Sequence, residues 1–476
     1  MCGFVGLIGL EDVSPSIYMA LQAIQHRGQD AAGIGTHDNG FLNIHKDVGM
    51  VSTALPPTAL RNLTGTSGIG HVRYPTLGGN SRGDAQPFMT RRPSIVLAHN
   101  GNVTNVAELE EHLVGRGMRM TSRCDSEPIL LVFGDELLQI RVAKHTEDDV
   151  IKALKILMSR VKGSYSVAAI MAVDGEETLV AFRDPFGIRP SVYGSRSDGA
   201  WMVASESVSL DVLDFNVVGH VPPGAVVFMR KGQEPIVRQI EPMPLHHCVF
   251  EDIYFARPDS IMESGRVYAR RRIMGQRLAA EWSTKGLEAD VIVAVPDTSR
   301  PAAQAMAETL GLPNREGFIK NRYSGRTFIM PDQASREAAM RLKLNPIDEI
   351  FRGQKVIMVD DSIVRGTTMR RMIDLVRRHE PAALHVAIFS PPVRNPCFYG
   401  IDMPSREELI AGQIPADELE LRLAESFGID SVTFLSHRGL AEVAGNRICA
   451  ACFTGEYPIP VNEDERGYIL KERRPE

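Results

Sequence analysis

The sequence has no uninterrupted apolar run of the roughly 18 residues that a membrane-spanning helix needs. It also lacks the charged and then apolar N-terminal segment that is typical of a secretory signal peptide. Basic residues are not in excess, because 53 Lys and Arg stand against 59 Asp and Glu, which gives a formal net charge of −6. Dedicated nucleic-acid-binding proteins usually carry a basic excess. We therefore expect a cytoplasmic protein that binds neither membranes nor nucleic acid.

Cysteine is scarce, with 6 residues in 476, and internal repeats and low-complexity tracts are absent. Six cysteines in so long a cytosolic chain do not form a disulfide framework. Hydrophobic residues make up 43% and charged residues 24% of the chain, which is close to the average for globular proteins and excludes a disordered chain. At a typical ~100–200 residues per domain, the length allows two or three domains.

The two halves of the chain differ in pattern. The first half has many short apolar runs broken by Gly, Asn and Asp, with helical patterns at 105–117 and 126–139, which indicates an α+β domain. In the second half, an apolar strand, a loop and an amphipathic helix follow one another at 289–311 and again at 354–380. This order predicts an α/β domain with a parallel sheet covered on both faces. We place the border in the Pro-rich stretch 233–247.

The N-terminal half carries the elements of an amide-hydrolysing site. Removal of the initiator methionine would expose Cys2, whose α-amine has an unperturbed pKa near ~8 and can act as general base for its own thiol. Arg73, at a predicted strand end, can clamp a carboxylate with two hydrogen bonds. Asn100 and Gly101 offer a side-chain amide and a backbone N–H for an oxyanion hole, and Asp125 can accept from an ammonium group. Each residue alone has an ordinary structural explanation. Together they predict a pocket for an amino acid with a cleavable side-chain amide.

Seven segments resemble, in this order, the glutamine-hydrolysing domain of N-terminal-nucleophile amidotransferases: MCGFVGLIG, QHRGQDAAG, HVRYPT, HNGNV, SRCDSE, RDPFGIRP and ASESVSLD. The resemblance covers residues 2–235 and implies a four-layer αββα fold. It implies that Cys2 attacks the side-chain amide of glutamine and releases ammonia. Arg73 would then bind the glutamine carboxylate and Asp125 its amine, and the oxyanion would lie at Asn100 and Gly101.

The string VIMVDDSIVRGTT places two carboxylates directly after a buried strand. Asp360 and Asp361, at the carboxyl end of a parallel strand, can bind ribose hydroxyls directly or through Mg²⁺. The loop Ser362–Thr368 offers backbone N–H groups to a phosphate, together with the hydroxyls of Thr367 and Thr368 at a helix start. The string therefore predicts a sugar-phosphate site. The alternative is a pair of aspartates that cap a helix beside a glycine turn.

The same string resembles the diphosphoribosyl-binding motif of type I phosphoribosyltransferases. VPDTSRPAA resembles their pyrophosphate loop, and KNRYSGRTFI, which also contains Arg322, resembles their mobile loop. FEDIYFARPDS and YGIDMPSREELIA resemble the amidophosphoribosyltransferase family, so that the resemblance spans essentially the whole chain and implies a phosphoribosyltransferase domain over 236–476. The residues implied to bind phosphoribosyl diphosphate are Asp360, Asp361, Ser362, Arg365, Gly366, Thr367, Thr368, Lys320 and Arg326. Those implied to hold Mg²⁺ are Thr298, Asp360 and Asp361.

The implied reaction transfers the amide nitrogen of glutamine to 5-phosphoribosyl 1-diphosphate. Its products are 5-phosphoribosylamine, glutamate and pyrophosphate, and it is the first committed step of purine biosynthesis. Ammonia made at Cys2 would pass to the second site, with loop closure coupling the two. The family also implies feedback inhibition by purine nucleotides and a homodimer or homotetramer. The arginine cluster 266–272 is one candidate nucleotide site, and a solvated helix face or a subunit contact is the alternative.

Four cysteines lie beside motifs of the second half. Cys449 and Cys452 form a C-x-x-C on a predicted loop, whereas Cys248 precedes FEDIYFARPDS and Cys397 precedes FYGIDMPS. Four thiolates suit tetrahedral zinc or a 4Fe–4S cluster, and the residues alone do not distinguish these from each other or from free thiols. One branch of the resembled family carries a 4Fe–4S cluster at cysteines beside these motifs, which favours the cluster. Cys124 is expected to be a buried structural residue.

Two other functions fit part of the sequence. The first half could serve another acceptor domain, such as a sugar isomerase or a synthetase, but VIMVDDSIVRGTT argues against this. A nucleotide-binding regulator of DNA with a phosphoribosyltransferase fold is the second alternative. The acidic net charge and the set Cys2, Arg73, Asn100 and Asp125 argue against it.

Overall fold

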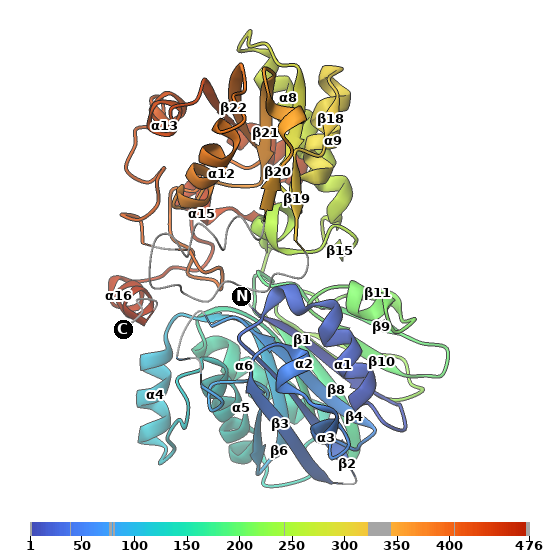
Figure 1. Ribbon diagram of the computed structural model, residues 1–476. Coiled ribbons are helices and arrows are strands. Elements are labelled where there is room, and N and C mark those ends of the chain that lie inside the picture. The colour runs from blue at the N-terminus through green and yellow to red at the C-terminus, as the bar shows by residue number, and fades with distance from the viewer. Residues whose placement is uncertain are drawn as a thin grey trace.

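A computed structural model describes residues 2–38, 40–75, 79, 81–241, 243–321, 344–403 and 405–472. Figure 1 shows two bodies stacked one above the other, the first half of the chain below and the second half above. The N-terminal end of the chain lies at the junction of the two bodies, and the C-terminal helix α16 (Glu463–Glu472) lies beside that junction.

The first body contains two antiparallel sheets packed face to face. One sheet has the strand order β11-β9-β10-β1-β4-β2-β3, and the other has the order β13-β12-β8-β7-β6-β5. Phe4 and Ile69 of the first sheet form an apolar layer with Val96 and Ile170 of the second. The strands of the first sheet are β1 (Gly3–Ile8), β2 (Ala31–Asp38), β3 (Phe41–Val48), β4 (Ser67–Arg73), β9 (Val192–Ser195), β10 (Trp201–Ala204) and β11 (Asn216–His220). Those of the second are β5 (Phe88–Arg91), β6 (Ser94–Val103), β7 (Gly163–Val173), β8 (Glu176–Arg183), β12 (Ala225–Met229) and β13 (Ile236–Gln239).

Helices cover the outer face of each sheet. Ile17 and Leu21 of α1 pack on Val5 of the first sheet, and Phe133 of α5 and Leu157 of α6 pack on the second. The four layers confirm the αββα fold that was expected for this half. The helices are α1 (Ser14–Ala23), the 3₁₀ turn η1 (Gln25–Arg27), α2 (Val51–Ala54), α3 (Pro57–Leu60), α4 (Val106–Gly115), α5 (Ser126–Ile140), α6 (Glu147–Arg160) and α7 (Val208–Asp211).

The second body contains a five-stranded parallel sheet of order β18-β17-β21-β22-β23. Its strands are β17 (Val291–Ala294), β18 (Asn314–Arg315), β21 (Lys355–Asp360), β22 (Ala383–Ile388) and β23 (Ser431–Phe434). Ile292 and Ile357 pack with α8 (Val267–Ser283) and α9 (Arg300–Leu310). Val293 and Met358 pack with α12 (Thr367–Arg377) and α13 (Leu419–Phe427) on the other face. Helices therefore cover both faces, as the apolar strand runs predicted.

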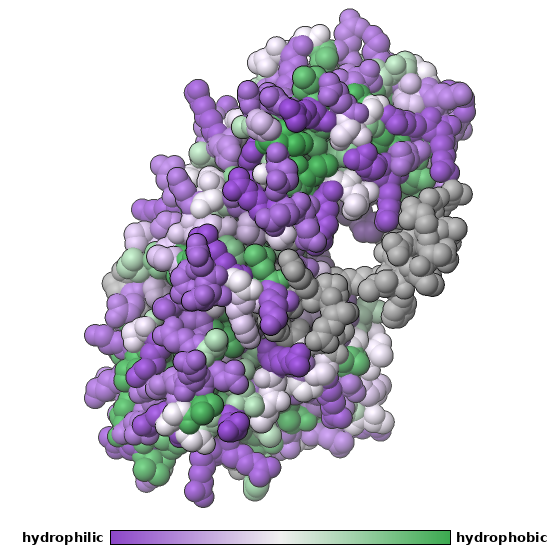
Figure 2. All heavy atoms as spheres, turned by 90° about the vertical axis from the view of Figure 1, so that its left-hand side faces the viewer, coloured by the Kyte–Doolittle hydropathy of each residue, from purple (hydrophilic) through white to green (hydrophobic). Residues whose placement is uncertain are grey.

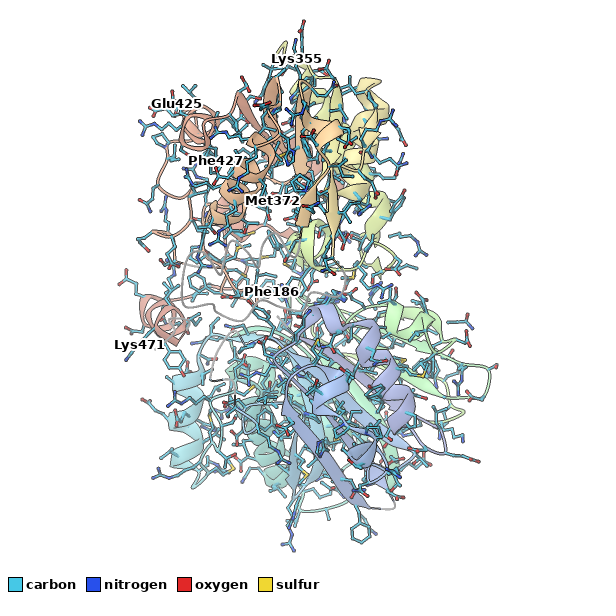
Figure 3. The ribbon with its side chains drawn as sticks, viewed as in Figure 1. Phe186, Lys355, Met372, Glu425, Phe427 and Lys471 are labelled. Atoms are coloured by element: carbon cyan, nitrogen blue, oxygen red, sulfur yellow. The ribbon has the colours of Figure 1, made fainter. Side chains whose placement is uncertain are left out.

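The parallel sheet is oriented toward the first body. Lys355, the first residue of β21, lies at the end of the second body that is farthest from the junction (Figure 3). The carboxyl end of β21 therefore points toward the first body. The other elements of this half are β14 (His247–Cys248), the π-helix η2 (Glu251–Phe255), β15 (Ile261–Met262), β16 (Gly265–Arg266), β19 (Phe318–Lys320), β20 (Leu344–Pro346), α11 (Asp348–Phe351), α14 (His437–Ala444), β24 (Ile448–Cys449) and α15 (Ala451–Thr454).

The surface is mostly hydrophilic on the face drawn in Figure 2, with small apolar patches. Phe41, Val142 and Leu421 are among the exposed apolar side chains. Within the described ranges, every helix is too short or too polar to cross a bilayer.

The two bodies share one apolar core. It runs from Phe133 and Leu157 of the first body through Val249 and Phe398 to Met274 on α8. Phe186 lies at the junction (Figure 3), where its ring meets the His246 ring edge-on with 5.7 Å between centroids. The bodies are thus joined by continuous apolar packing.

A buried ion network also crosses the junction. Arg27 of η1 is fully buried, and its guanidinium pairs with Glu206 at 2.5 Å and with Glu251 of the second body at 2.9 Å. Glu251 also pairs with the buried Arg189 at 3.3 Å. Burial alone would lower the pKa of Arg27, but the charges of Glu251 and Glu206 outweigh burial and raise it. Because a buried charge without a partner is strongly unfavourable, both carboxylates are needed.

We expect Glu251→Ala to lower the free energy of unfolding by about 3–5 kcal/mol, because the substitution leaves two buried guanidinium groups short of a partner. Denaturant titration measures this, with tryptophan fluorescence reporting from Trp201 in the first body and Trp282 in the second.

The matched control is Glu380→Ala, because the Glu380 carboxylate forms an exposed ion pair with Arg352 at 2.6 Å. Exposed ion pairs contribute little to the free energy of unfolding, because water and salt screen the two charges. Equal effects of the two substitutions would contradict the structural importance of the buried network.

Candidate functional sites

Cys2 directly precedes β1 and is held by the turn that follows α1. Its Sγ lies 3.5 Å from the carbonyl oxygen of Tyr74, and its own carbonyl accepts a 2.9 Å hydrogen bond from Nε of Arg27. Gly28 allows this turn to approach Arg73, because a Cβ at Gly28 would lie 2.5 Å from the backbone carbonyl carbon of Arg73. The turn therefore brings Cys2 and Arg73 into one site.

Two opposite charges lie beside the nucleophile. Arg73 is the last residue of β4 and is 2% exposed, and Asp125 precedes α5 and is 6% exposed. Burial alone would lower the pKa of Arg73, but the neighbouring Cys124, Cys2, Asp84 and Asp125 raise it. A buried cation and a neighbouring buried carboxylate suit the α-carboxylate and α-ammonium of an amino acid.

The Arg73 guanidinium donates to the carbonyl of Asp84, and the Asp125 carboxylate accepts a 2.9 Å hydrogen bond from the Val103 N–H. A pocket of about 480 Å³ opens beside these groups, lined by Gly79, Ser81, Asp84, Met120, Thr121, Ser122 and Arg123. The site therefore has an opening next to the carbonyl that orients Arg73.

Asn100 and Gly101 lie near the end of β6, in register with Ser166 and Tyr165 of β7. Asn100 is fully buried, and within the described part of the chain neither its Nδ2 nor its Oδ1 has a hydrogen-bond partner. An unpaired buried amide is costly, so this group is prepared to donate to a bound ligand. A side chain at position 101 is excluded, since a Cβ there would lie 2.0 Å from the Ser164 carbonyl oxygen.

Sequence reasoning missed Arg27 and Asp84, which orient the nucleophile and the carboxylate clamp. Arg27 lies within the quoted segment QHRGQDAAG, so the only available signal was an arginine beside a glycine in a motif. Burial and ion pairing, which reveal its role, depend on contacts far apart in the sequence.

The second site lies where β17 and β21 end. These neighbouring strands are parallel, with Ala294 opposite Val359, so the loop that contains Thr298 begins beside Asp360. The Asp361 N–H donates to Oδ1 of Asp360 at 2.9 Å, and the Ser362 hydroxyl donates to Oδ1 of Asp361 at 2.5 Å. Two neighbouring carboxylates thus lie at the carboxyl edge of the sheet, together with a threonine-containing loop.

Burial raises the affinity of both carboxylates for protons, and at Asp360 the neighbouring Asp361 charge adds to this effect. Burial raises the pKa of Asp361 to about 6, against the opposing effects of the Ser362 hydroxyl and the Arg271 charge. Burial and the Asp361 charge raise the pKa of Asp360. A divalent cation would stabilise both as carboxylates, and oxygen donors are the ligands that Mg²⁺ prefers. The donor set therefore fits magnesium.

The turn that follows the aspartates, which we call the phosphate turn, leads into α12. Gly366 has a φ of 75° and precedes α12, and a Cβ there would lie 2.7 Å from Cδ1 of Ile410. Thr367 and Thr368 are exposed at the N-terminus of α12, where backbone N–H groups favour an anion. The turn is fixed by a 3.0 Å hydrogen bond from the Ile410 N–H to the Val364 carbonyl.

The structure describes some of the cationic residues that were expected to bind the diphosphate. Lys320 ends β19, and its Nζ contacts Oδ2 of Asp297 at 2.7 Å. Arg365 contacts Glu408 at 3.3 Å. Arg322 and Arg326 lie outside the described residues.

Four cysteines meet at the base of the second body. β14 and β24 pair in parallel, with Cys248 opposite Cys449. The Cys452 carbonyl accepts 3.0 Å hydrogen bonds from the N–H groups of Arg394 and Asn395, just before Cys397. Among the described residues these cysteines form no disulfide, and none of the four is more than 8% exposed. The C-x-x-C, expected on a loop, instead lies on β24 and α15, because strand pairing with β14 orders it.

Each of these thiols disfavours the deprotonation of its neighbours, because two thiolates close together repel each other. Burial, together with the neighbouring cysteines, raises the pKa of Cys248, Cys449 and Cys452. The buried Arg189 opposes this at Cys248, to which it donates a hydrogen bond. Four thiolates could therefore coexist here only with a bound cation or metal cluster.

Cys124 is 1% exposed, as expected for a buried residue.

The arginine cluster of α8 spreads around the helix. Arg271 is buried, with Nε and Nη2 each 2.8 Å from the carbonyls of Asp252 and Ala256. Arg272 pairs with Glu308 at 2.6 Å. Arg271 is thus a structural residue, which argues against a single arginine face for nucleotide phosphates.

Comparison with known proteins matches both bodies. A glutamine amidotransferase domain model matches residues 71–212, and a phosphoribosyl transferase domain model matches residues 267–396. The amidophosphoribosyltransferase of Pseudomonas aeruginosa is 42% identical over 96% of this chain and 93% of its own length. That of Methanocaldococcus jannaschii is 38% identical over 97% of this chain and 98% of its own.

A solved structure of the glutamine phosphoribosylpyrophosphate amidotransferase of B. subtilis, complexed with ADP and GMP, superposes with a TM-score of 0.86. It is 36% identical and covers 97% of this chain and 98% of its own. The likeness extends through both bodies and the junction between them. The chain therefore belongs to the amidophosphoribosyltransferase family.

Proposed function

We propose that this protein transfers the amide nitrogen of glutamine to 5-phosphoribosyl 1-diphosphate, giving 5-phosphoribosylamine, glutamate and pyrophosphate. The observation that carries this proposal is the presence of both sites in one chain. Cys2 contacts Arg27 of the ion network that joins the two bodies, and the carboxyl end of β21 in the second body is directed toward the junction. Family membership supports the same reaction, as the first committed step of purine biosynthesis.

At the first site, the α-amine of Cys2 takes the thiol proton while Sγ attacks the side-chain carbonyl carbon of glutamine. Asn100 Nδ2 and the Gly101 N–H stabilise the oxyanion, and ammonia leaves with the proton held by the amine. Water then releases glutamate from the thioester. The buried charges of Arg73 and Asp125 hold the two ends of the amino acid, so that only a substrate of this length places its amide at Cys2.

At the second site, Asp360 and Asp361 bind the ribose hydroxyls and, with Thr298, would hold Mg²⁺. That ion, when bound, neutralises the diphosphate leaving group. Ser362, Arg365, Gly366, Thr367 and Thr368 surround the 5-phosphate at the start of α12. Lys320 and Arg326 are proposed to bind the diphosphate as ammonia attacks C1 and pyrophosphate leaves.

Regulation by purine nucleotides is proposed on one observation, that the B. subtilis relative was solved with ADP and GMP. The relative arrangement of subunits, as a homodimer or homotetramer, is likewise a proposal that rests on family membership.

We propose that Cys248, Cys397, Cys449 and Cys452 hold a 4Fe–4S cluster. All four cysteines are buried, and burial together with the charges of neighbouring cysteines raises the thiol pKa of Cys449 and Cys452, so a bound cluster would stabilise the thiolates at this place. Zinc and free thiols are the alternatives.

The first prediction concerns the free amine. A variant with one extra residue before Cys2 should lose glutamine-dependent activity and keep ammonia-dependent activity, because the general base is acylated. Parallel assays of pyrophosphate release with each donor measure this. A protease site that leaves Cys2 first after cleavage provides the control and should restore glutamine use. Hydrolysis of glutamine by the blocked protein would contradict the role of the amine.

The second prediction concerns the paired carboxylates. Asp361→Asn should lower ammonia-dependent activity by at least about 100-fold and raise the Mg²⁺ concentration required, since such a metal contributes several kcal/mol to transition-state stabilisation. Asp374→Asn, at an exposed position of α12 close to the same motif, should match the unaltered protein. An Asp361→Asn protein with unchanged activity and Mg²⁺ dependence would remove Asp361 from the site.

The third prediction concerns the cysteines. Protein purified without oxygen should be brown and contain about four iron atoms and four sulfides per chain. Cys397→Ser should lower the iron content and the visible absorption, whereas Cys124→Ser, at a buried cysteine outside the cluster, should keep both. Colourless protein loaded with zinc would contradict the iron–sulfur assignment.

A further inference from the structure

A segment of the second body lies directly against the oxyanion strand of the first. We call it the strap and define it as residues 398–402, which follow Cys397. The Asn102 side chain donates a 3.0 Å hydrogen bond from Nδ2 to the Phe398 carbonyl, and the Ser164 hydroxyl donates a 2.9 Å bond to the Tyr399 carbonyl. All four residues are at most 2% exposed.

These two bonds flank the predicted oxyanion donor. Asn102 and Ser164 face each other in the β6–β7 register, one position beyond Gly101. The third contact is between two backbones, because a Cβ at Gly400 would lie 3.0 Å from the Gly101 carbonyl oxygen. Gly400 has a φ of 101°, so a side chain there would be disfavoured both by its backbone conformation and by this contact. The strap therefore contacts Gly101 itself and also Asn102 and Ser164 beside it.

The other side of the strap is fixed to the second body. The Tyr399 N–H lies 3.4 Å from Sγ of Cys397, and the Tyr399 hydroxyl donates a 2.5 Å hydrogen bond to the Ile459 carbonyl. Farther along the chain, the Ile410 N–H bonds the Val364 carbonyl of the phosphate turn at 3.0 Å. The strap is thus attached to the cysteine site and leads into the phosphate turn.

The side chains of Asn102 and Ser164 are fully buried, and each donates a hydrogen bond to a backbone carbonyl of the strap. Because the two residues pair across β6 and β7 directly beside Gly101, these bonds act on the chemistry through the backbone of the two strands. An oxyanion hole is sensitive to such displacement, because its donors must lie at hydrogen-bond distance from an atom that carries charge only in the transition state.

We propose that Asn102 and Ser164 are positioning residues that hold the Gly101 N–H in the oxyanion hole by joining β6 and β7 to the strap. The second body thereby sets the geometry of the glutamine-hydrolysing site. This inference rests on the proposed role of Asn100 and Gly101 as oxyanion donors.

The test compares Asn102→Ala and Ser164→Ala with two matched controls. Asn105→Ala removes a buried amide that donates to the Arg160 carbonyl at 2.8 Å, and Ser209→Ala removes a buried hydroxyl that donates to the Ala20 carbonyl at 3.1 Å. Both control bonds stay within the first body.

The expected result is a loss in kcat for glutamine hydrolysis of about 10-fold to 100-fold in the two strap variants, since a misplacement of about 1 Å at a reacting group costs on the order of 100-fold. The KM for glutamine and the ammonia-dependent activity should match those of the controls, because the substrate clamps and the second site are unchanged.

A second measurement separates positioning from a general structural effect. Glutamate γ-semialdehyde adds reversibly to the Cys2 thiol, with the new C–S bond replacing the carbonyl π bond and the oxygen lying in the oxyanion hole. Its affinity should fall by the same factor as kcat, while the affinity for glutamate stays unchanged. Equal weakening of both ligands would overturn the proposal.

The variant Asn100→Ala tests the oxyanion assignment separately from the role of the strap. If Asn100→Ala keeps full glutamine hydrolysis, the oxyanion assignment is wrong. If Asn100→Ala loses it while both strap variants behave like their controls, the strap inference is wrong and the assignment stands. Should Asn102→Ala fail to fold by circular dichroism, the milder Ser164→Ala decides by the same two measurements.

Discussion

The guanidinium of Arg27 is the interaction on which the junction depends. It is fully buried, so it can remain charged only while partners replace its water. Those partners include the Cys2 carbonyl, Glu206 of the first body and Glu251 of the second. One planar group therefore orients the nucleophile and requires the second body to be present. Glu251 extends the network to Arg189 and, through it, to the thiol of Cys248.

The rest of the architecture is consistent with this arrangement. A single apolar core continues from the helices outside the second sheet of the first body to α8 of the second. The parallel pairing of β14 and β24 places two cysteines opposite each other at the base of that body. β21 directs its carboxyl end, where Asp360 lies, toward the junction. Motion of either body relative to the other would break buried polar contacts as well as apolar packing.

Much of this was predictable from the sequence, because local patterns determine it. Alternating short strands and the apolar runs at β17 and β21 predicted the two fold classes, and the position of Asp360 and Asp361 after a buried strand predicted their placement at a sheet edge. The borders of α4 and α5 agree with the helical periodicity to within about two residues. These features depend on neighbours within one or two turns of chain.

What could not be predicted depends on pairs of residues far apart in the sequence. Arg27 and Glu251 are ordinary charged residues until the fold buries them together. The C-x-x-C was expected on a loop because its strand partner, β14, lies two hundred residues earlier and consists of only two residues. The contact between the strap and β6 could not be predicted for the same reason, because Asn102 and Phe398 are far apart in the sequence and share no local pattern.

The pairing of β14 with β24 also has a consequence for how the protein is made. Cys248 leaves the ribosome before Cys449 by 449 − 248 = 201 residues, a delay on the order of 10–40 s at ordinary rates of synthesis. The first body is complete in sequence well before the segments that brace it exist. On the proposed arrangement, a nascent chain cannot produce ammonia efficiently until the strap, residues 398–402, has been added. Asp360 and Asp361 precede the strap in the sequence, so these acceptor-site residues have been synthesised before glutamine hydrolysis becomes efficient.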